Sequence, residues 1–583
     1  SLSISSENIF PIIKKWVYSD HDIFVREMIS NGCDAITKLK KLDVMGEYQL
    51  PDDYKASIHV EVNPEEKTLK FIDTGLGMTA DEVEEYITQI AFSGATQFLE
   101  KYKDKTTEDD MIGHFGLGFY SAFMVADEVH IDTLSYKDGA TPVRWVSNGG
   151  TEYEMTEGDK QTVGSEITLY LNDDCLEFAN EYRVREVIQK YCSFMPVEIF
   201  LSKANAEPEY ETIDEADLKE DDEVVEHIHE DAKTEEKENE NGGKEVVEVS
   251  PAKDKVKIKK RPESLSDIHP LWTKHPNECS DEDYKEFYRK VFLDYKEPLF
   301  WIHLNMDYPF NLKGILYFPR INTEYDSIEG TIKLYNNQVF IADNIKEVIP
   351  EFLMVLKGVI DCPDLPLNVS RSALQNDGFV GKIAEYISKK VADKLAGMCK
   401  TKREDYEKYW DSISPFIKFG CLKDEKFCDK MKDAVLFKDI DGKYLTLKDC
   451  VEANGGELKE LDKNAAPDNA EENAEEKKTT IYYVTDEIQQ SQYINMFRAQ
   501  GQDAVVLKHN IDSPFITQLE QRYQNVQFQR IDADVTDNAK EEVAEDEKEA
   551  FQKTVDSLTA TFRKELGNDK LDVKVEKLKD SNV

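Results

Sequence analysis

An acidic segment from Glu207 to Glu248 divides this sequence and limits what the chain can fold into. The segment holds 19 acidic and four basic residues. A composition of this kind buries too little apolar surface to order itself, so we predict a disordered linker. The chain has 583 residues, whereas single cores stop growing at roughly 250–300 residues. We therefore expect two or three domains, with this linker as the clearest boundary.

The net charge of the chain argues against several classes of function. With 118 acidic and 73 basic residues, the chain carries a net charge of −45, which repels nucleic acid and anionic membranes. Its nine cysteines form no CxxC pair, which fits a reducing compartment better than a disulfide framework. The sequence shows neither a signal peptide nor a run of 18 apolar residues. We expect a soluble, cytoplasmic protein that binds neither nucleic acid nor membrane.

Hydrophobic periodicity predicts both strands and helices before and after the linker, which is typical of a mixed α/β protein. The expected strands are Ala56–Val62, Thr68–Asp73, Trp301–Leu304, Gly314–Phe318, Lys333–Ile341, Thr480–Val484 and Leu571–Leu578. The expected helices are Asp22–Leu42, Thr79–Ala91, Ile345–Val359, Gly378–Lys400 and Glu547–Leu566. Ser19, three residues before Asp22, resembles the start of a capping box for the first of these helices.

The first expected helix carries a polar stripe. Glu27, Asn31, Asp34 and Lys38 are spaced four, three and four residues apart, so at about 100° per residue they share one face. Taken alone, the stripe is typical of the wet side of an amphipathic helix. Two further motifs in the same half of the chain favour a ligand site instead.

The second motif is a carboxylate at the end of a strand. Asp73 follows Phe71-Ile72 and leads into the glycine-rich sequence TGLGM. Glycines allow close approach of the backbone, which suits recognition of a small polar ring such as adenine. We expect Asp73 to accept a hydrogen bond from the exocyclic amine, and Met78 to pack on the base because a thioether conforms to flat surfaces. A plain turn after a strand has the same pattern.

The third motif, GHFGLGFYS, holds Gly113, Gly116 and Gly118 before an apolar helical start. Successive backbone N–H groups can turn toward an anion here, and the dipole of the following helix makes phosphate a natural ligand. No Lys-Ser/Thr pair follows, which excludes a Walker loop, and Ser121 stands where a dinucleotide fingerprint has its third glycine. The preceding polar segment, Phe92–Met111, is a candidate lid.

The order of these motifs resembles the N-terminal ATPase of the heat-shock protein 90 chaperones. REMISNGCDA, DTGLGM, IGHFGLGFYS and GSEI stand before the linker, and PLWTKHPNE, DLPLNVSRSALQ and IYYVT continue the resemblance after it. The resemblance covers essentially the whole chain. The sequence is most similar to the bacterial branch, because it lacks the acidic C-terminal tail peptide of the eukaryotic cytosolic members. An α+β and α/β multidomain fold is implied, which begins with the sandwich shared by DNA gyrase and histidine kinases.

The resemblance also implies the domain boundaries. We expect an N-terminal ATP-binding domain over 1–203, the charged linker over 204–262, a middle domain over 263–535 and the start of a C-terminal dimerisation domain over 536–583. In the family this last domain continues with helices that join two protomers, and the opening SLSIS is also short of the family's leading segment. We interpret the sequence as truncated, and we expect a monomer or weak dimer with slow ATP turnover.

The family pattern assigns a role to each matching pocket residue. Glu27 corresponds to the general base that activates the attacking water, and Asn31 corresponds to the amide that ligates Mg²⁺. Asp73 corresponds to the aspartate that reads adenine. The other residues expected to bind ATP are Asp34, Gly77, Met78 and Ser165 near the helix and base, and Gly113, Gly116, Gly118 and Phe119 near the phosphates.

Two middle-domain residues complete the implied catalytic site. Arg371 corresponds to an arginine that reaches the γ-phosphate when the two domains dock, and Gln375 corresponds to its partner. The implied function is an ATP-dependent chaperone of the stress response that closes on unfolded or partly folded client proteins. Tyr86 and Phe92 depart from the family's usual asparagine and lysine. The resemblance therefore does not assign nucleotide contacts to the helix that precedes the lid.

Other functions can use the same type of pocket. A histidine kinase needs an acceptor histidine on a helical hairpin, whereas His21 opens the pocket helix itself. A scaffold gated by nucleotide has no need of Glu27, and the net charge disfavours a DNA topoisomerase. Trp301, Phe300 and Phe310 are candidates for client contact, although core positions are the favoured interpretation for all three.

Overall fold

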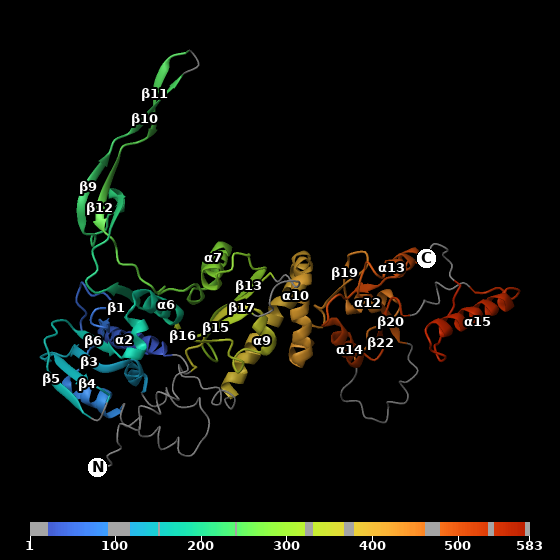
Figure 1. Cartoon of the computed structure of the whole chain (residues 1–583), viewed down its shortest axis with the longest axis horizontal. Helices are drawn as coiled ribbons and strands as arrows, with labels where there is room; N and C mark the ends of the chain where they lie inside the picture. The colour runs from blue at the N-terminus through green and yellow to red at the C-terminus, as the bar shows by residue number, and fades with distance from the viewer. Residues whose placement is uncertain are drawn as a thin grey trace, which may run out of the picture.

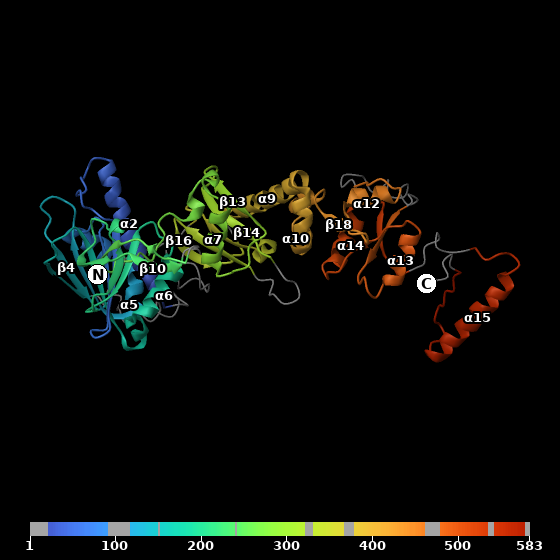
Figure 2. The ribbon, with the colours of Figure 1, turned by 90° about the horizontal axis from the view of Figure 1, so that it is seen from above.

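The computed structural model of the protein describes residues 21–90, 117–149, 152–238, 242–320, 330–365, 378–460, 478–533 and 542–577. Its units follow one another along the long axis, from an N-terminal sheet through a second sheet with long helices to a smaller α/β unit and a final helix (Figures 1 and 2). A β-ribbon projects from the N-terminal unit (Figure 1). Within the described ranges, no helix combines the length and apolar character needed to cross a membrane.

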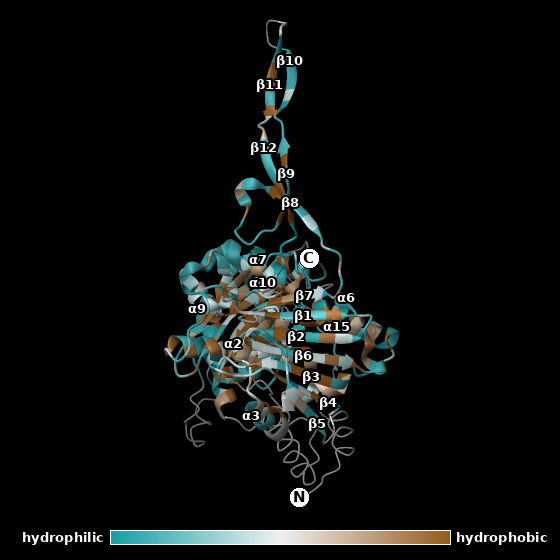
Figure 3. Cartoon of the chain, turned by 90° about the vertical axis from the view of Figure 1, so that its left-hand side faces the viewer, coloured by the Kyte–Doolittle hydropathy of each residue, from teal (hydrophilic) through white to brown (hydrophobic). Residues whose placement is uncertain are grey.

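The N-terminal unit is built on a seven-stranded sheet in the order β5-β4-β3-β6-β2-β1-β7, which Figure 3 shows from bottom to top. The strands are β1 (Ser57–Asn63), β2 (Thr68–Asp73), β3 (Ala126–Leu134), β4 (Val143–Ser147), β5 (Tyr153–Glu157), β6 (Gly164–Leu171) and β7 (Glu198–Lys203). Neighbours run antiparallel apart from β1 and β7, which pair in parallel. The strands predicted at Ala56–Val62 and Thr68–Asp73 are confirmed as β1 and β2.

Helices pack against this sheet and bury its core. They are α2 (Ile23–Val44), α3 (Ala80–Glu82), η2 (Val83–Ile90), η4 (Leu117–Ser121), α5 (Ala122–Val125), η5 (Asp173–Ala179) and α6 (Glu181–Cys192). The apolar side chains of α2 recur at helical spacing and are buried. Among them, Phe24 packs edge-on against Phe71 of β2 and Phe178, with ring centroids 6.5 and 4.9 Å apart. The predicted pocket helix is therefore confirmed as α2.

The start of α2 differs from the predicted capping box. Ser19 lies outside the described residues. The residue before the helix is Asp22, whose carboxylate makes no cap but accepts a hydrogen bond from the Tyr191 hydroxyl at 2.9 Å. Lys190 lies 3.3 Å from the same carboxylate. These contacts tie the first turn of α2 to α6.

The helix predicted over Thr79–Ala91 is present but changes its geometry. Thr79 and Glu82 form a capping box around α3, and the helix continues as the π-helix η2. Ala91 and the predicted lid, Phe92–Met111, lie outside the described residues. A π-helix is rare and is found mostly at functional positions, and this one leads directly toward the lid segment.

The acidic segment has regular structure, so the prediction of a disordered linker was wrong. Together with the residues directly after it, the segment forms β8 (Tyr210–Asp214), η6 (Glu215–Asp217), β9 (Val224–Glu230), β10 (Lys233–Glu238), β11 (Lys244–Ser250) and β12 (Lys253–Lys259). These strands make a three-stranded sheet, β8-β12-β9, that extends into the hairpin β10-β11 (Figure 1). Val256 and Ile258 are buried at its base. In β12 these two apolar side chains alternate with lysines, which is a strand pattern that the overall composition conceals.

The second unit contains a five-stranded sheet in the order β13-β14-β17-β15-β16. Its elements are η7 (Leu271–Thr273), η8 (Pro276–Glu278), α7 (Asp281–Phe292), β13 (Phe300–Met306), β14 (Leu312–Phe318), β15 (Thr331–Asn336), β16 (Val339–Asp343), η9 (Glu351–Val355) and β17 (Lys357–Asp361). The strands predicted at Trp301–Leu304 and Gly314–Phe318 are confirmed. Phe300 and Phe310 are buried, which confirms the core interpretation for both, and Trp301 stacks on Tyr284 with centroids 5.1 Å apart.

Two predictions in this unit were wrong. The single strand expected over Lys333–Ile341 is a hairpin, because Asn337 and Gln338 take positive φ values of 46° and 68° and form a tight turn. The helix expected over Ile345–Val359 is absent. Pro350 precedes the short 3₁₀ turn η9, and the chain then enters β17 at the centre of the sheet. The apolar run of the predicted helix, Phe352–Leu356, lies in and directly after η9, and a buried run this short does not allow sequence periodicity to distinguish a helix from other buried structure.

Long helices connect the second unit to the third. The remaining elements are α9 (Gly378–Thr401), α10 (Arg403–Lys423), α11 (Glu425–Met431), β18 (Leu436–Lys438), β19 (Tyr444–Thr446), α12 (Leu447–Ala453), β20 (Thr479–Val484), α13 (Ser491–Ala499), β21 (Val505–Val506), α14 (Asp512–Arg522), β22 (Val526–Arg530) and α15 (Lys548–Glu565). A buried ion pair between Lys418 and Asp512 joins α10 to α14. The predictions of α9, β20 and α15 are confirmed, whereas the strand expected from Leu571 is absent over the described residues up to 577.

Candidate nucleotide site

The polar stripe of α2 faces one side of the N-terminal unit. Asn31, Asp34 and Lys38 are exposed, and Glu27 is half-buried. Burial raises the pKa of the Asp34 carboxyl, Lys38 lowers it and Glu27 raises it, so these three charges act on one another. The prediction that the stripe shares one face is therefore confirmed.

Asp73 lies at the last position of β2, directly opposite Ser165 of β6 in the strand register. Its Oδ1 accepts a hydrogen bond from the Gly75 N–H at 2.9 Å. Burial raises the pKa of Asp73 to about 7, even though backbone hydrogen bonds from Gly75 and Ser165 oppose the shift. A Cβ at Gly32 of α2 would lie 3.1 Å from the Cβ of Asp73. The strand-end carboxylate is thus packed directly against the pocket helix.

The loop after Asp73 has room only for glycine. Gly77 has a φ of +64°, and a Cβ there would lie 1.9 Å from the Leu134 carbonyl oxygen. A Cβ at Gly75 would lie 2.5 Å from the Cβ of Ala35. The loop therefore runs between α2 and the end of β3, which explains why glycine is needed at both positions.

Thr133 is a site residue that the sequence did not reveal. It is fully buried on β3, and its hydroxyl lies 2.8 Å from the Ser165 hydroxyl. The same oxygen accepts a hydrogen bond from the Met78 N–H at 2.9 Å. One side chain therefore holds two of the residues expected around adenine. Only the strand order β3-β6-β2 identifies Thr133 as a site residue. This order depends on pairing between strands that are far apart in the sequence.

The described end of the glycine-rich motif lies against Glu27. A Cβ at Gly118 would lie 2.7 Å from the Glu27 Oε2. The ring of Phe119 points into the core, 6.1 Å from Phe123 and 6.0 Å from Trp145 between ring centroids. Phe119 therefore anchors this turn through its side chain. The position expected for phosphate and the expected general base are thus adjacent.

Several predicted site residues lie outside the described ranges. These are Gly113, Gly116, Arg371 and Gln375, together with the departure at Phe92. Tyr86, the other departure, lies on η2 with 49% of its surface exposed. The described residues thus bring together the helix stripe, the strand-end carboxylate and the turn at Gly118.

Hydrogen bonds link the pocket helix to the second unit. Arg26 pairs with Glu27 at 3.0 Å, and its Nη1 donates to the carbonyl of Phe340 in β16 at 3.3 Å. Beside it, the Gln338 amide donates to the carbonyls of Phe194 at 2.8 Å and Ile268 at 3.1 Å. The β15–β16 hairpin is therefore bonded to the N-terminal unit at two points, Arg26 of α2 and Phe194 after α6.

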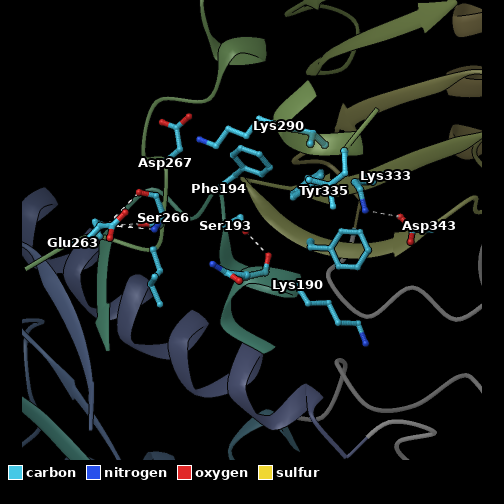
Figure 4. Close-up of a pocket in the computed structure, with 16 residues that line it drawn as sticks. Lys190, Ser193, Phe194, Glu263, Ser266, Asp267, Lys290, Lys333, Tyr335 and Asp343 are labelled. Carbon is cyan, nitrogen blue, oxygen red and sulfur yellow. Dashed lines mark hydrogen bonds and ion pairs between the residues drawn. The ribbon is translucent and has the colours of Figure 1, made fainter. Parts of the chain in front are cut away.

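A cavity of about 610 Å³ opens beside these bonds (Figure 4). Lys190, Lys290 and Lys333 reach its wall from α6, α7 and β15, and Lys333 pairs with Asp343 at 3.5 Å. Of the residues predicted to bind ATP, those within the described ranges do not line this cavity. It is a separate space between the N-terminal and second units.

This arrangement, an N-terminal mixed sheet with a polar helix, a strand-end aspartate and a glycine turn, defines an ATPase domain. Residues 19–161 match the sequence model described as "Histidine kinase-, DNA gyrase B-, and HSP90-like ATPase". Residues 177–583 match the model described as "Hsp90 protein". The chain belongs to the Hsp90 family, and it is an ATP-dependent chaperone of that family. The second match, which runs to the end of the chain, removes the histidine kinase and topoisomerase alternatives.

Curated relatives of the chain agree with this assignment. "Chaperone protein htpG" of Bacteroides fragilis (strain YCH46) is 40% identical over 570 residues, which cover 97% of this chain and 74% of the relative. "Chaperone protein HtpG" of Bacteroides thetaiotaomicron is 40% identical over 574 residues with the same coverage. The corresponding protein of Porphyromonas gingivalis (strain W83) is 39% identical over 547 residues, covering 94% of this chain and 71% of the relative. The predicted bacterial resemblance is confirmed.

Proposed function

We propose that this chaperone binds ATP between α2 and the end of β2 and hydrolyses it with Glu27 as the general base. The supporting observation is the closeness of Gly118 to Glu27, since a Cβ placed on this glycine would lie 2.7 Å from the Glu27 Oε2. Because this turn lacks a side chain, the Glu27 carboxylate comes close to the backbone that we expect to bind the phosphates, where it can accept a proton from the attacking water. Arg26 holds the carboxylate through Oε1 and leaves Oε2 toward the turn.

In this proposal, Asp73 selects adenine. Its carboxylate accepts a hydrogen bond from the exocyclic amine, while Met78 packs on the ring and the Ser165 hydroxyl lies beside the base. Gly77 keeps the loop close to the ligand. Thr133 positions the loop and the hydroxyl through its two hydrogen bonds. A buried carboxylate gains a strong partner when the amine arrives, which favours adenine over bases that present an acceptor there.

Asn31 is the proposed protein ligand of Mg²⁺. Its amide is exposed on the face of α2 that carries Glu27, one turn away. Among the described residues, no three acidic, histidine or cysteine side chains gather in a way that would hold a metal by themselves. This fits an ion that takes most of its oxygens from phosphates and water, as Mg²⁺ commonly does. Bound there, Mg²⁺ would neutralise charge on the phosphates.

The rest of the proposal concerns the conformational cycle. Arg371 and Gln375 reach the γ-phosphate only when the units dock, so hydrolysis follows closure of the clamp on an unfolded or partly folded client protein in the cytoplasm. The names of the relatives support a chaperone role. The predicted weak self-association remains a prediction, and sedimentation of the chain at micromolar concentration tests it: a tight dimer would contradict it.

The Glu27→Gln variant tests the catalytic assignment. The amide retains the oxygen that accepts from Arg26 but cannot act as a base. Phosphate release should fall by about 10²–10⁴-fold, the usual contribution of a general base, while ATP affinity stays within about threefold. Lys38→Ala, on the same face but about three turns further along α2, is the control and should retain turnover. Unchanged turnover in Glu27→Gln would show that this carboxylate is not the base.

A further inference from the structure

Another cavity, of about 660 Å³, lies in the second unit where its sheet meets the long helices α9 and α10. Its wall takes residues from α7, from β13, from the end of β14 and from the junction of α9 with α10. Part of this wall is aromatic, since the rings of Phe300 and Tyr409 lie 5.4 Å apart between centroids. The volume lies in the range of pockets that bind small molecules. The described residues of the nucleotide site do not line this cavity.

Three cations on this wall have no acidic partner among the residues that the structure describes. They are Arg320, which follows β14, Lys394 on α9 and Lys402 between α9 and α10. All three side chains are exposed. In a chain with 118 acidic and 73 basic residues, a basic side chain has many possible partners of opposite charge. Three unpaired cations on one cavity wall therefore leave room for an anion from solution.

The carboxylates of the same wall do not compensate this charge. Three of the four are paired with lysines, in the pairs Glu297–Lys285 at 3.3 Å, Asp393–Lys430 at 3.0 Å and Asp405–Lys408 at 3.9 Å. The fourth, Asp281, lies in the first turn of α7, where the helix dipole stabilises a negative charge. The wall thus keeps an excess of positive charge.

Two of the cations repel each other. Partial burial lowers the pKa of Lys394 from its ordinary value of 10.5, and the positive charge of Lys402 lowers it further. Like charges that are held close together without an anion raise the free energy of the unliganded protein. A bound anion would remove this repulsion and would gain both ammonium groups as partners.

A glycine inside α9 keeps the cavity open. Gly397 lines the cavity, and a Cβ placed on it would meet no atom within 4 Å. Packing therefore does not require glycine at this position, although glycine is less favourable in a helix than alanine. Lys394 is three residues away and lies on the same face of the helix. A larger side chain at position 397 would occupy the space beside this lysine.

We propose that this cavity binds a small multivalent anion of the phosphate class, held by Arg320, Lys394 and Lys402. The guanidinium is a planar fork that matches two phosphate oxygens, and the two ammonium groups add point charges. Inorganic pyrophosphate uses the cations alone, whereas a phosphate ester of a ring compound also contacts the aromatic part of the wall. The bound anion would join the end of β14 to the junction of α9 and α10, which leads to the third unit.

Calorimetric titration of the unmodified chain with inorganic pyrophosphate, at low ionic strength and without Mg²⁺, tests the proposal. Binding is expected, and it should weaken as salt screens the charges. Arg320→Ala, Lys394→Ala and Lys402→Ala should each weaken it by about tenfold, because each removes a charged hydrogen-bond donor. Lys426→Ala is the matched control, since this lysine pairs with Glu385 at 2.9 Å outside the cavity. Equal affinities in all these chains would place pyrophosphate elsewhere and overturn the proposal.

Two substitutions at Gly397 separate the loss of space from the loss of charge. Gly397→Ala should bind pyrophosphate like the unmodified chain, because its Cβ has open space. Gly397→Phe keeps all three cations but fills the cavity, so it should weaken binding by about tenfold or more. Both substituents favour a helix more than glycine does, so neither variant should lose stability in thermal unfolding, and both should retain ATP turnover. Unchanged affinity in Gly397→Phe would refute the site.

Labelling with pyridoxal 5′-phosphate tests the ring-bearing ligand. Its aldehyde condenses with a neutral lysine amine and releases water, and borohydride reduces the resulting imine to a stable amine that peptide mass spectrometry locates. Lys394 should react at lower reagent concentration than Lys426, whose pKa is raised by its hydrogen bond to Glu385. Pyrophosphate should protect Lys394 and leave Lys426 unprotected. Labelling of both lysines at the same concentration, without protection by pyrophosphate, would contradict a phosphate site at Lys394.

Discussion

Replacing Asp73 by asparagine should stabilise the nucleotide-free protein at neutral pH. Folding raises the pKa of this acid from its ordinary value of 3.8 to about 7, chiefly through burial. Between these two values the folded state holds a proton that the unfolded state has lost. Stability therefore falls as the pH rises through this window. Asparagine carries no charge, has nearly the same volume and keeps an oxygen for the Gly75 N–H, so this loss should disappear.

The size of the effect follows from the pKa values. At 1.36 kcal/mol for each pKa unit, the ionised carboxylate lowers the free energy of unfolding by roughly 4 kcal/mol at pH 8. At pH 4.5 the same calculation gives about 1 kcal/mol. The stability advantage of Asp73→Asn should therefore grow several-fold between these pH values. ATP binding should become weaker by about 10- to 150-fold, since a hydrogen bond to a charged group contributes roughly 1.5–3 kcal/mol.

Hydrogen exchange measures this locally in a chain of several units. The opening free energy is obtained from the amides of β2 and β6 between pH 5 and 8, after correction for intrinsic exchange rates. Asp132→Asn is the control, because Asp132 is also buried but pairs with Arg144 at 2.8 Å. That variant should gain no stability. If Asp73→Asn is no more protected than the unmodified chain at pH 8, burial of this carboxylate does not carry the stated cost.

Three further substitutions test the packing of the fold. Gly77→Ala should lower the free energy of unfolding of the N-terminal unit in urea by more than about 2 kcal/mol. The control is Gly139→Ala, where φ is positive but the space is open, and it should lower this free energy by only about 1 kcal/mol. Equal losses would contradict the steric argument. Thr133→Val should cost about 1–2 kcal/mol and weaken ATP binding, because two polar groups lose their partner. Lys418→Met should lower the stability measured by thermal unfolding by roughly 3–5 kcal/mol, because it leaves the buried Asp512 carboxylate without its partner. Adding Asp512→Leu should restore most of this stability. If the double variant is instead less stable than Lys418→Met, the ion pair itself stabilises the fold.

Local features of the site were predictable from the sequence. The helical spacing of Glu27 and Asn31, the strand that ends at Asp73 and the glycine at position 77 all depend on residues close together in the chain. Their chemistry follows from residue type and from the backbone freedom of glycine. The sequence therefore predicted the helix, the strand and the nucleotide-binding loop before any tertiary contact was known.

Features that depend on distant partners were not predictable in the same way. Thr133 became a site residue only because β3 and β6 are neighbours, which places its hydroxyl beside Ser165. The run Phe352–Leu356 before β17 has the composition of a buried helix as much as of a buried strand, and its tertiary surroundings decide the outcome. The strands of the acidic segment were missed because its net charge was weighed over the whole segment, whereas the antiparallel pairing of its strands does not show in composition.

The β-ribbon has a consequence for how the first two units are connected. A flexible tether of about 60 residues would span roughly 40–45 Å and would set the effective concentration of one unit near the other. Here the two ends of the insertion are joined: the Leu265 N–H bonds to the Ile199 carbonyl at 2.8 Å, and Lys260 N–H bonds to the Glu209 carbonyl at 2.8 Å. The insertion therefore projects from a closed base and does not act as a flexible tether between the two units. Lengthening or shortening its tip alters how far the β-ribbon reaches, while the separation of the two units stays fixed by the bonds at its base.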